Sequence, residues 1–164
     1  MQKKILKKYF KGKKVLITGH SGFKGSWLTL WMYFNGAKVL GISKGIPTKP
    51  SHLNLLNFKK KILSKNIDIN DLNKFKKTFF KFNPDYVFHL AAQAIVKVSY
   101  SQPLKTWGTN LIGTVNLLEC LRFVKKKTIV VMITSDKAYK NLEIKRGYIE
   151  NDILKGEDPY GASK

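Results

Sequence analysis

The stretch that decides the fold is Val15-Leu16-Ile17-Thr18-Gly19-His20-Ser21-Gly22-Phe23-Lys24-Gly25. It joins an apolar run to a glycine-rich turn, and the apolar-rich segment 26–32 follows directly. A strand, a glycine-rich turn and a helix in this order form a socket for the pyrophosphate of a dinucleotide, because backbone N–H groups at the helix N-terminus point at the anion. The sequence therefore predicts a phosphate-binding turn at residues 19–25.

Each glycine of this turn has a predicted task. Gly19 lets the chain turn sharply off the strand, Gly22 lets the backbone approach a phosphate, and Gly25 lets the helix pack close to the sheet. The spacing is G-x-x-G-x-x-G, so the turn is one residue longer than in the most familiar dinucleotide fingerprint. The alternative is a glycine-rich turn that binds nothing, and the turn alone does not exclude it.

Length and composition favour one domain. The 164 residues, 43% of them hydrophobic, are enough for one sizeable core. No apolar run is as long as a membrane span, no secretory signal precedes the first apolar run, and the single cysteine, Cys120, has no partner for an internal disulfide. We therefore expect a cytoplasmic protein with no membrane partner.

The formal net charge of +21 raises the question of a nucleic-acid partner. Arg122 and Arg146 are the only arginines among the 31 basic residues, whereas bidentate recognition of phosphates and bases favours arginine. The lysines are also spread over predicted solvent-facing surfaces, as on the helix expected to contain Lys74, Lys77 and Lys81. We therefore do not expect a nucleic-acid partner.

Short apolar segments alternate with longer amphipathic ones along the chain. This order predicts an α/β fold, a Rossmann-type doubly wound parallel sheet with strands 1 to 5 present and helices on both faces. The predicted strands are residues 14–18, 37–43, 62–67, 86–92 and 128–134. The first predicted helix runs from about Gly25 to before Gly36. The second runs from Asn70 or Asp71 to Asn83-Pro84, and the third from about Pro103 to Phe123.

A polar loop at 140–157 precedes one more helix start. Asp158-Pro159 reads as an N-cap followed by a residue favoured at the first helical position. The sequence stops at Lys164, less than two turns into this helix, where few hydrogen bonds and little packing are available. We expect residues 1–164 to be an incomplete NAD(P)-binding domain of a longer protein.

Two groups of reactive side chains follow the predicted strands. Tyr160 and Lys164 lie at i and i+4, where a neighbouring ammonium favours the phenolate form and hence a general base. Thr134-Ser135-Asp136-Lys137 falls at the carboxyl edge of the sheet, where ligands of open α/β folds bind. There Ser135 could bind a sugar oxygen, Asp136 could act as an acid and Lys137 as a base. The alternatives are an exposed Tyr and Lys, and an N-cap or a surface ion pair.

With these motifs in place, the chain resembles the extended short-chain dehydrogenase/reductase family, which acts on nucleotide sugars. Within it, a narrower set of motifs is similar to the CDP-glucose 4,6-dehydratases, from about Tyr9 to the last residue. The broad motifs are residues 19–25, His89-Leu90-Ala91-Ala92, Asn110 within 109–114, and Tyr160 with Lys164; the narrower ones are residues 19–28, 134–141, 147–152 and 158–160.

The resemblance implies roles for individual residues. The turn at 19–25 surrounds the dinucleotide phosphates, Asp68 and Ile69 flank the adenine, and residues 90–93 line the ribose and nicotinamide. Tyr160 removes the proton of the sugar 4-hydroxyl, and Lys164 holds the nicotinamide ribose. The implied catalytic residues are Ser135, Asp136, Lys137, Tyr160 and Lys164; the implied cofactor-binding residues are Gly19, Ser21, Gly22, Phe23, Lys24, Gly25, Asp68, Ile69, Leu90, Ala91, Ala92, Gln93, Asn110, Thr134, Tyr160 and Lys164.

The implied reaction converts CDP-glucose to CDP-4-keto-6-deoxyglucose. Oxidation at C4 acidifies the C5 hydrogen, the 6-hydroxyl leaves as water and hydride returns to C6, so NAD must stay bound throughout. Related dTDP-glucose dehydratases carry Asp-Glu where this chain has Asp136-Lys137, which favours the CDP-sugar. A UDP-N-acetylglucosamine dehydratase, a sugar epimerase, a non-catalytic dinucleotide-binding protein and a basic nucleic-acid module remain as alternatives.

The chain departs from the family pattern in two places. Ser43-Lys44-Gly45 stands where many members have an acidic residue for the adenosine ribose, so Lys44 could instead meet the 2′-phosphate of NADP. The C-terminal substrate domain, with a sixth strand, is missing, so the fragment alone is expected to be inactive. For the whole protein the resemblance implies a homodimer or homotetramer that binds a nucleotide sugar.

The histidines and possible metal ligands give weaker signals. His20 reads as a turn residue near the phosphates, and His89, inside a buried strand, reads as a hydrogen-bonded core residue. No spacing of His, Cys, Asp and Glu matches a metal site.

Overall fold

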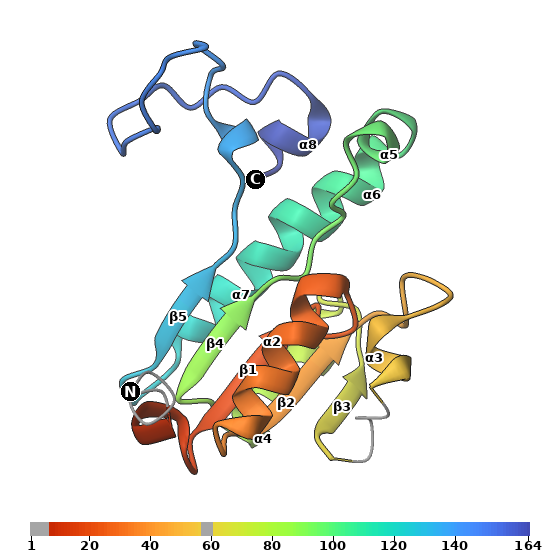
Figure 1. The fold of residues 1–164 in the computed structure, drawn as a ribbon, viewed down its shortest axis with the longest axis vertical. Coiled ribbons are helices and arrows are strands. Elements are labelled where there is room, and N and C mark those ends of the chain that lie inside the picture. Colours follow the sequence, from red (N-terminus) through yellow and green to blue (C-terminus); the bar gives the residue numbers. More distant parts are fainter. Residues whose placement is uncertain (1–6, 57–60) are drawn as a thin grey trace.

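The computed structural model describes residues 7–56 and 61–164. Its core is a five-stranded parallel sheet in the order β3-β2-β1-β4-β5 (Figure 1). The strands are β1 (Lys14–Thr18), β2 (Lys38–Ser43), β3 (Leu63–Asn66), β4 (Tyr86–His89) and β5 (Ile129–Met132). The predicted fold class and all five strands are confirmed.

The central strand β1 is the most buried part of the sheet. Val15, Leu16 and Ile17 are completely buried, as suits a parallel strand covered on both faces. β1 pairs with β2 on one side and with β4 on the other, and the strand order reverses between these neighbours. In open α/β sheets such a reversal leaves a crevice at the carboxyl ends of the strands.

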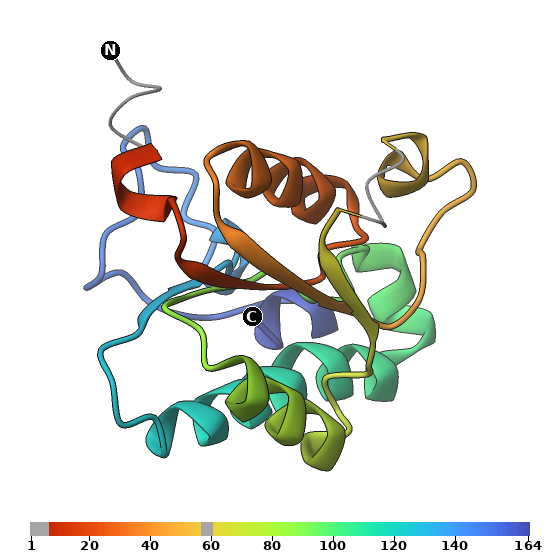
Figure 2. The same cartoon turned by 90° about the horizontal axis from the view of Figure 1, so that it is seen from below.

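Helices cover the two faces of the sheet (Figure 2). α2 (Phe23–Phe34) and the short α3 (His52–Leu55) lie on one face, while α4 (Leu72–Phe82) and α7 (Gly113–Arg122) lie on the other. The core under α4 and α7 is the larger one, with Phe75, Phe79 and Leu117 fully buried. The sequence predicted helices on both faces, because short apolar segments alternate with longer amphipathic ones along the chain.

Two short helices lie in segments for which the sequence predicted no element. α3 is four residues long, and the side chain of its N-cap, Ser51, accepts a hydrogen bond from Asn54 N (3.4 Å). α5 (Val96–Ser101) directly follows the loop after β4. Helices this short do not build up the hydrophobic periodicity on which sequence prediction depends.

The long helix predicted at 103–123 is present but not uniform. It consists of α6 (Pro103–Trp107), a π-helical turn (Gly108–Ile112) and α7. π-helical turns frequently occur at functional sites. β4 also ends earlier than the predicted residue 92, since the chain leaves the sheet after His89.

Beyond β5 the chain lies at the carboxyl edge of the sheet. A 3₁₀ turn (Asp136–Ala138) is followed by a long loop and by α8 (Pro159–Ala162), which sits close to α5 and α6 (Figure 1). Asp158 caps α8 as predicted, with Gly161 N donating to its carboxylate (2.9 Å). In the described parts of the chain, no helix has the length and apolar character needed to cross a membrane.

Candidate functional site

The turn between β1 and α2 is shaped by its glycines. Gly19 has a φ of +72°, and a Cβ there would lie 2.8 Å from the backbone nitrogen of Ala91. A Cβ at Gly25 would overlap the carbonyl oxygen of Gly19. The N-cap of α2 is Gly22, so no capping side chain satisfies the N–H groups of the first turn. This helix N-terminus is therefore suited to an anion.

A cavity of about 620 Å³ opens beside this turn, at the carboxyl ends of the strands. Its size is in the range of small-molecule binding sites. Of the predicted site residues, those that line it are Gly19, Ser21, Gly22, Phe23, Lys24, Gly25, Asp68, Ile69, Leu90, Ala91, Ala92, Thr134, Tyr160 and Lys164. Lining residues that sequence reasoning did not single out as ligands include Pro47, Thr48, Ile67, Ala94, Ile95, Thr109 and Ile133.

Asn110 and Gln93, both predicted to bind the cofactor, do not line the cavity. Asn110 is buried in the π-helical turn; its side chain accepts from Gln93 N (2.8 Å) and donates to Gln93 O (3.1 Å) and to Ser163 Oγ (2.8 Å). It thereby joins the loop after β4 to α8. Asn110 therefore holds neighbouring parts of the site in position and does not itself line the cavity.

Tyr160 and Lys164 both line the cavity, although they come from the last residues of the chain. α8 ends at Ala162, so Lys164 lies just beyond it, and its ammonium donates to Ile133 O (2.9 Å) at the end of β5. Burial lowers the pKa of Lys164. The chain thus places a phenol and an amine on one wall of the cavity.

Ser135, Asp136 and Lys137 lie on the same sheet edge but outside the cavity wall. Ser135 Oγ donates to Asp136 Oδ1 (3.2 Å) and accepts from Lys137 N (3.2 Å), which makes Ser135 the N-cap of the 3₁₀ turn. This turn packs against α8, since a Cβ on Gly161 would lie 2.6 Å from the carbonyl oxygen of Lys137. The three side chains are therefore neighbours of the cavity.

The two histidines near the site are buried. His89 bonds to Thr18 Oγ1 (2.8 Å) and Thr114 Oγ1 (3.1 Å), and burial, together with the charge of Lys164, lowers its pKa to about 4. His20 does not line the cavity: its ring bonds to Ser43 Oγ and Ser64 Oγ, each at 2.8 Å. The ring of His20 therefore ties the turn to β2 and β3 instead of facing a phosphate.

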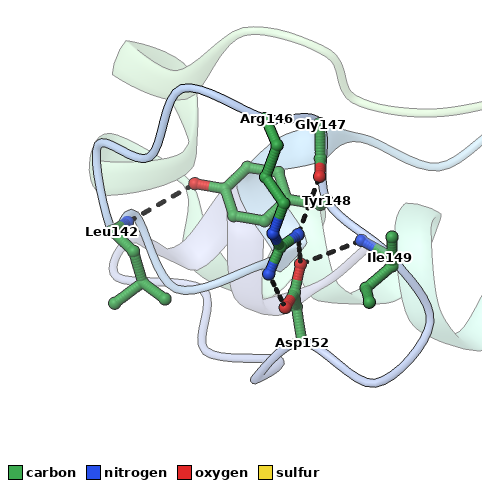
Figure 3. A network of polar contacts seen from close by, with 6 residues as sticks. All are labelled: Leu142, Arg146, Gly147, Tyr148, Ile149 and Asp152. Carbon is green, nitrogen blue, oxygen red and sulfur yellow. Dashed lines mark hydrogen bonds and ion pairs between the residues drawn. The ribbon is translucent and has the colours of Figure 1, made fainter.

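The long loop between the 3₁₀ turn and α8 has a defined internal structure (Figure 3). Arg146 makes a bidentate ion pair with Asp152 (2.7 and 2.8 Å), and Ile149 N also donates to that carboxylate (2.9 Å). These bonds lower the pKa of Asp152 to about 2. The Tyr148 ring stacks on Tyr139 at 4.8 Å between centroids. The loop holds its own shape beside the candidate catalytic residues.

Comparison with known sequences places this geometry in a family. The profile of the family described as GDP-mannose 4,6 dehydratase matches residues 16–164, which include the turn, the cavity walls and α8. The chain belongs to this family. Its resemblance to the extended short-chain dehydrogenases/reductases, and within them to CDP-glucose 4,6-dehydratases, is confirmed by the relatives that follow.

Curated relatives of this dehydratase family member include a CDP-glucose 4,6-dehydratase of Salmonella typhimurium, 46% identical over 98% of this chain and 45% of the relative. A dTDP-glucose 4,6-dehydratase of Haemophilus influenzae is 32% identical over 92% of this chain and 48% of the relative. The chain therefore spans about half the length of the curated relatives it matches.

Solved structures agree on the fold. The Thermus thermophilus UDP-glucose 4-epimerase in complex with NAD matches with a TM-score of 0.78 and 30% identity, over 92% of this chain and 47% of that one. The Thermotoga maritima UDP-glucose 4-epimerase with UDP-glucose matches with a TM-score of 0.73 and 29% identity, over 92% and 47%.

Proposed function

We propose that the protein containing this chain is a nucleotide-sugar 4,6-dehydratase that converts CDP-glucose to CDP-4-keto-6-deoxyglucose. The observation that carries the proposal is the 46% identity to the Salmonella CDP-glucose 4,6-dehydratase, spread over 98% of the chain. The order Asp136-Lys137, rather than Asp-Glu, supports CDP-glucose over dTDP-glucose. Residues 1–164 are the cofactor-binding part, and the substrate domain belongs to the remainder of the protein.

A nicotinamide dinucleotide fits the residues that line the cavity. Side chains are absent at Gly19 and Gly25, where a Cβ would clash, and the N–H groups at the start of α2 lack a capping side chain. The cavity extends from this anion site to Tyr160. Within residues 7–56 and 61–164, no three His, Cys, Asp or Glu side chains are placed to hold a metal ion.

The chain's own residues then take the following roles. Bound NAD supplies a group that takes hydride from the sugar and returns it. Tyr160 takes the proton of the 4-hydroxyl as the general base, and Lys164, which also lines the cavity, holds the nicotinamide ribose. Lys137 takes the C5 proton, and Asp136 protonates the departing 6-hydroxyl. Both are exposed here, so we infer that the substrate domain covers them and excludes water.

The proposed site of action is the cytoplasm, because the chemistry uses a soluble nucleotide sugar and NAD. We also propose a homodimer or homotetramer. Apolar side chains on the outer face of α7 support a partner subunit: Leu111, in the π-helical turn, Val115 and Leu118 are 41, 46 and 45% exposed.

The test is conversion of CDP-glucose by the full-length protein with NAD, followed by mass spectrometry for the loss of one water. Tyr160→Phe removes the ionisable hydroxyl and should reduce turnover by at least about 100-fold, the usual contribution of a general base. Tyr9→Phe, which changes a 55% exposed tyrosine of the N-terminal segment, is the matched control and should keep full turnover.

The same assay separates the alternatives. dTDP-glucose, UDP-N-acetylglucosamine and UDP-glucose are offered in parallel, and the UDP-glucose products are also examined for epimerisation at C4. If CDP-glucose stays unchanged while another nucleotide sugar reacts, the substrate assignment is wrong. If Tyr160→Phe keeps full turnover, the assigned base is wrong.

A further inference from the structure

A lysine and an aspartate face each other across one end of the cavity. Lys44 follows β2 directly and Asp68 lies two residues after β3, and both line the cavity. Lys44 Nζ is 2.6 Å from Asp68 Oδ2. The carboxyl end of β2 is where dinucleotide-binding folds distinguish NAD from NADP, with an acidic residue for a ribose diol or a basic one for a 2′-phosphate. Here one residue of each kind forms a pair.

The backbone on both sides of this pair is held by hydrogen bonds. Gly45 N donates to Asn66 Oδ1 (2.8 Å), and Gly45 O accepts from Ser21 Oγ (2.7 Å). On the other side, Asn70 N donates to Asp68 Oδ1 (3.0 Å). The Lys44 side chain itself is 75% exposed, against 28% for that of Asp68. The carboxylate is therefore the fixed partner and the ammonium the movable one.

Asp68 weakens the attraction of the Lys44 ammonium for a phosphate of a ligand. A free ammonium at this place attracts a 2′-phosphate, but an ammonium beside a carboxylate contributes little net charge. The Asp68 carboxylate also carries a negative charge at this end of the cavity, so it repels the 2′-phosphate that Lys44 alone would attract. Asp68 thus brings an acidic group to the carboxyl end of β2, where residues 43–45 supply none.

We propose that Asp68, as the internal counter-ion of Lys44, makes this cavity select NAD over NADP, and that without Asp68 the lysine becomes a 2′-phosphate site. This inference rests on the proposed function, since it assumes a nicotinamide dinucleotide in the cavity. The lowered pKa of Asp68 agrees with this proposal. Burial alone would raise the pKa of this carboxyl, but the Lys44 ammonium and the Asn70 N–H hold it below its usual value. The Asp68 carboxyl is therefore ionised at neutral pH.

The experiment measures dissociation constants of NAD and NADP for the full-length protein by isothermal titration calorimetry. The variants are Asp68→Asn, Lys44→Met and the double variant. Asparagine keeps an oxygen for the bond from Asn70 N, so the turn after β3 is preserved. The matched controls are Glu119→Gln, a carboxylate paired with Arg122 on α7, and Lys38→Met, at the opposite end of β2.

The wild type should bind NAD more tightly than NADP. Asp68→Asn should shift the NADP-to-NAD affinity ratio toward NADP by about tenfold, the change expected when one charge-assisted hydrogen bond to a phosphate is gained. Adding Lys44→Met should abolish that shift, and the controls should leave the ratio unchanged. An equal effect of Asp68→Asn on both ligands, or a shift that survives Lys44→Met, overturns the inference.

Failure of the proposed function would look different. In that case the wild-type protein would bind neither NAD nor NADP, while circular dichroism showed that it was folded. A wild type that binds both dinucleotides but keeps its ratio in Asp68→Asn would leave the dehydratase assignment intact and remove only the role of the pair.

Discussion

At the scale of single residues, His89 shows how a buried group makes stability depend on pH. His89 is 4% exposed and hydrogen-bonded at both ring nitrogens, and burial lowers its pKa from the ordinary value of 6.5 to about 4. The unfolded chain therefore binds a proton between pH 6.5 and 4 that the folded chain does not. The stability that His89 contributes is full above pH 6.5 and falls as the pH falls through this window.

When the pH falls from 7 to 5, protonation of His89 in the unfolded chain should lower the free energy of unfolding of the wild type by about 2 kcal/mol. His89→Gln keeps a polar side chain but cannot titrate. The free energy of unfolding of this variant should therefore decrease by about 2 kcal/mol less over the same pH interval. Urea unfolding at the two pH values measures both. Equal pH dependence in the two proteins would show that His89 does not titrate as described.

At the scale of elements, the packing of α7 on the loop after β3 depends on Gly113. A Cβ there would overlap the Ile69 side chain, which is 4% exposed and lines the cavity. Glycine to alanine normally stabilises a helix, but here the added methyl group must enter a filled core. Gly113→Ala should therefore destabilise the protein by about 1–3 kcal/mol.

Gly108→Ala is the matched control for Gly113→Ala. It lies in the adjoining π-helical turn, and its Cβ would meet only Asn70 Nδ2, at an ordinary 3.6 Å. Thermal unfolding should show a loss for Gly113→Ala alone, and Ile69→Val should recover part of it by shortening the clashing side chain. If the variant that combines Gly113→Ala with Ile69→Val recovers no stability, the contact with the Ile69 side chain is not the cause of the loss.

At the scale of the whole molecule, apolar side chains on one face of the edge strand β5 are exposed within the part of the chain that the structure describes. Ile129, Val131 and Ile133, on or just after β5, are 47, 39 and 38% exposed, and β5 is an edge strand of the described sheet. The relatives are about twice as long as the matched region. An exposed apolar edge of this kind promotes association of chains.

We therefore expect residues 1–164 expressed alone to bind a hydrophobic dye and to self-associate, and the full-length protein to do so much less. Dye fluorescence and light scattering at equal concentration measure the difference. Val131→Lys on the short chain should reduce its association, since it places a charge on the strand edge. Identical dye binding by the two lengths would show that the remainder of the protein does not cover β5.

Several parts of the fold were predictable because they depend on interactions between residues that are close together in the sequence. The apolar runs, the glycine spacing at 19–25 and the cap at Asp158 each reflect interactions within a few residues, so strands, turn and helix start were predicted correctly. α3 and α5 were not predicted, because helices of four and six residues carry too little periodicity.

Chain order and periodicity were enough to predict the parallel α/β sheet, and the resemblance to the dehydratases implied most of the residues that line the cavity. Which side chains contact one another became clear from the three-dimensional structure. Asn110 joins Gln93 to Ser163, His20 turns away from the cavity, and Lys44 is paired with Asp68. These contacts link residues 17 to 53 positions apart, and local sequence patterns carry no information on how such distant side chains are oriented.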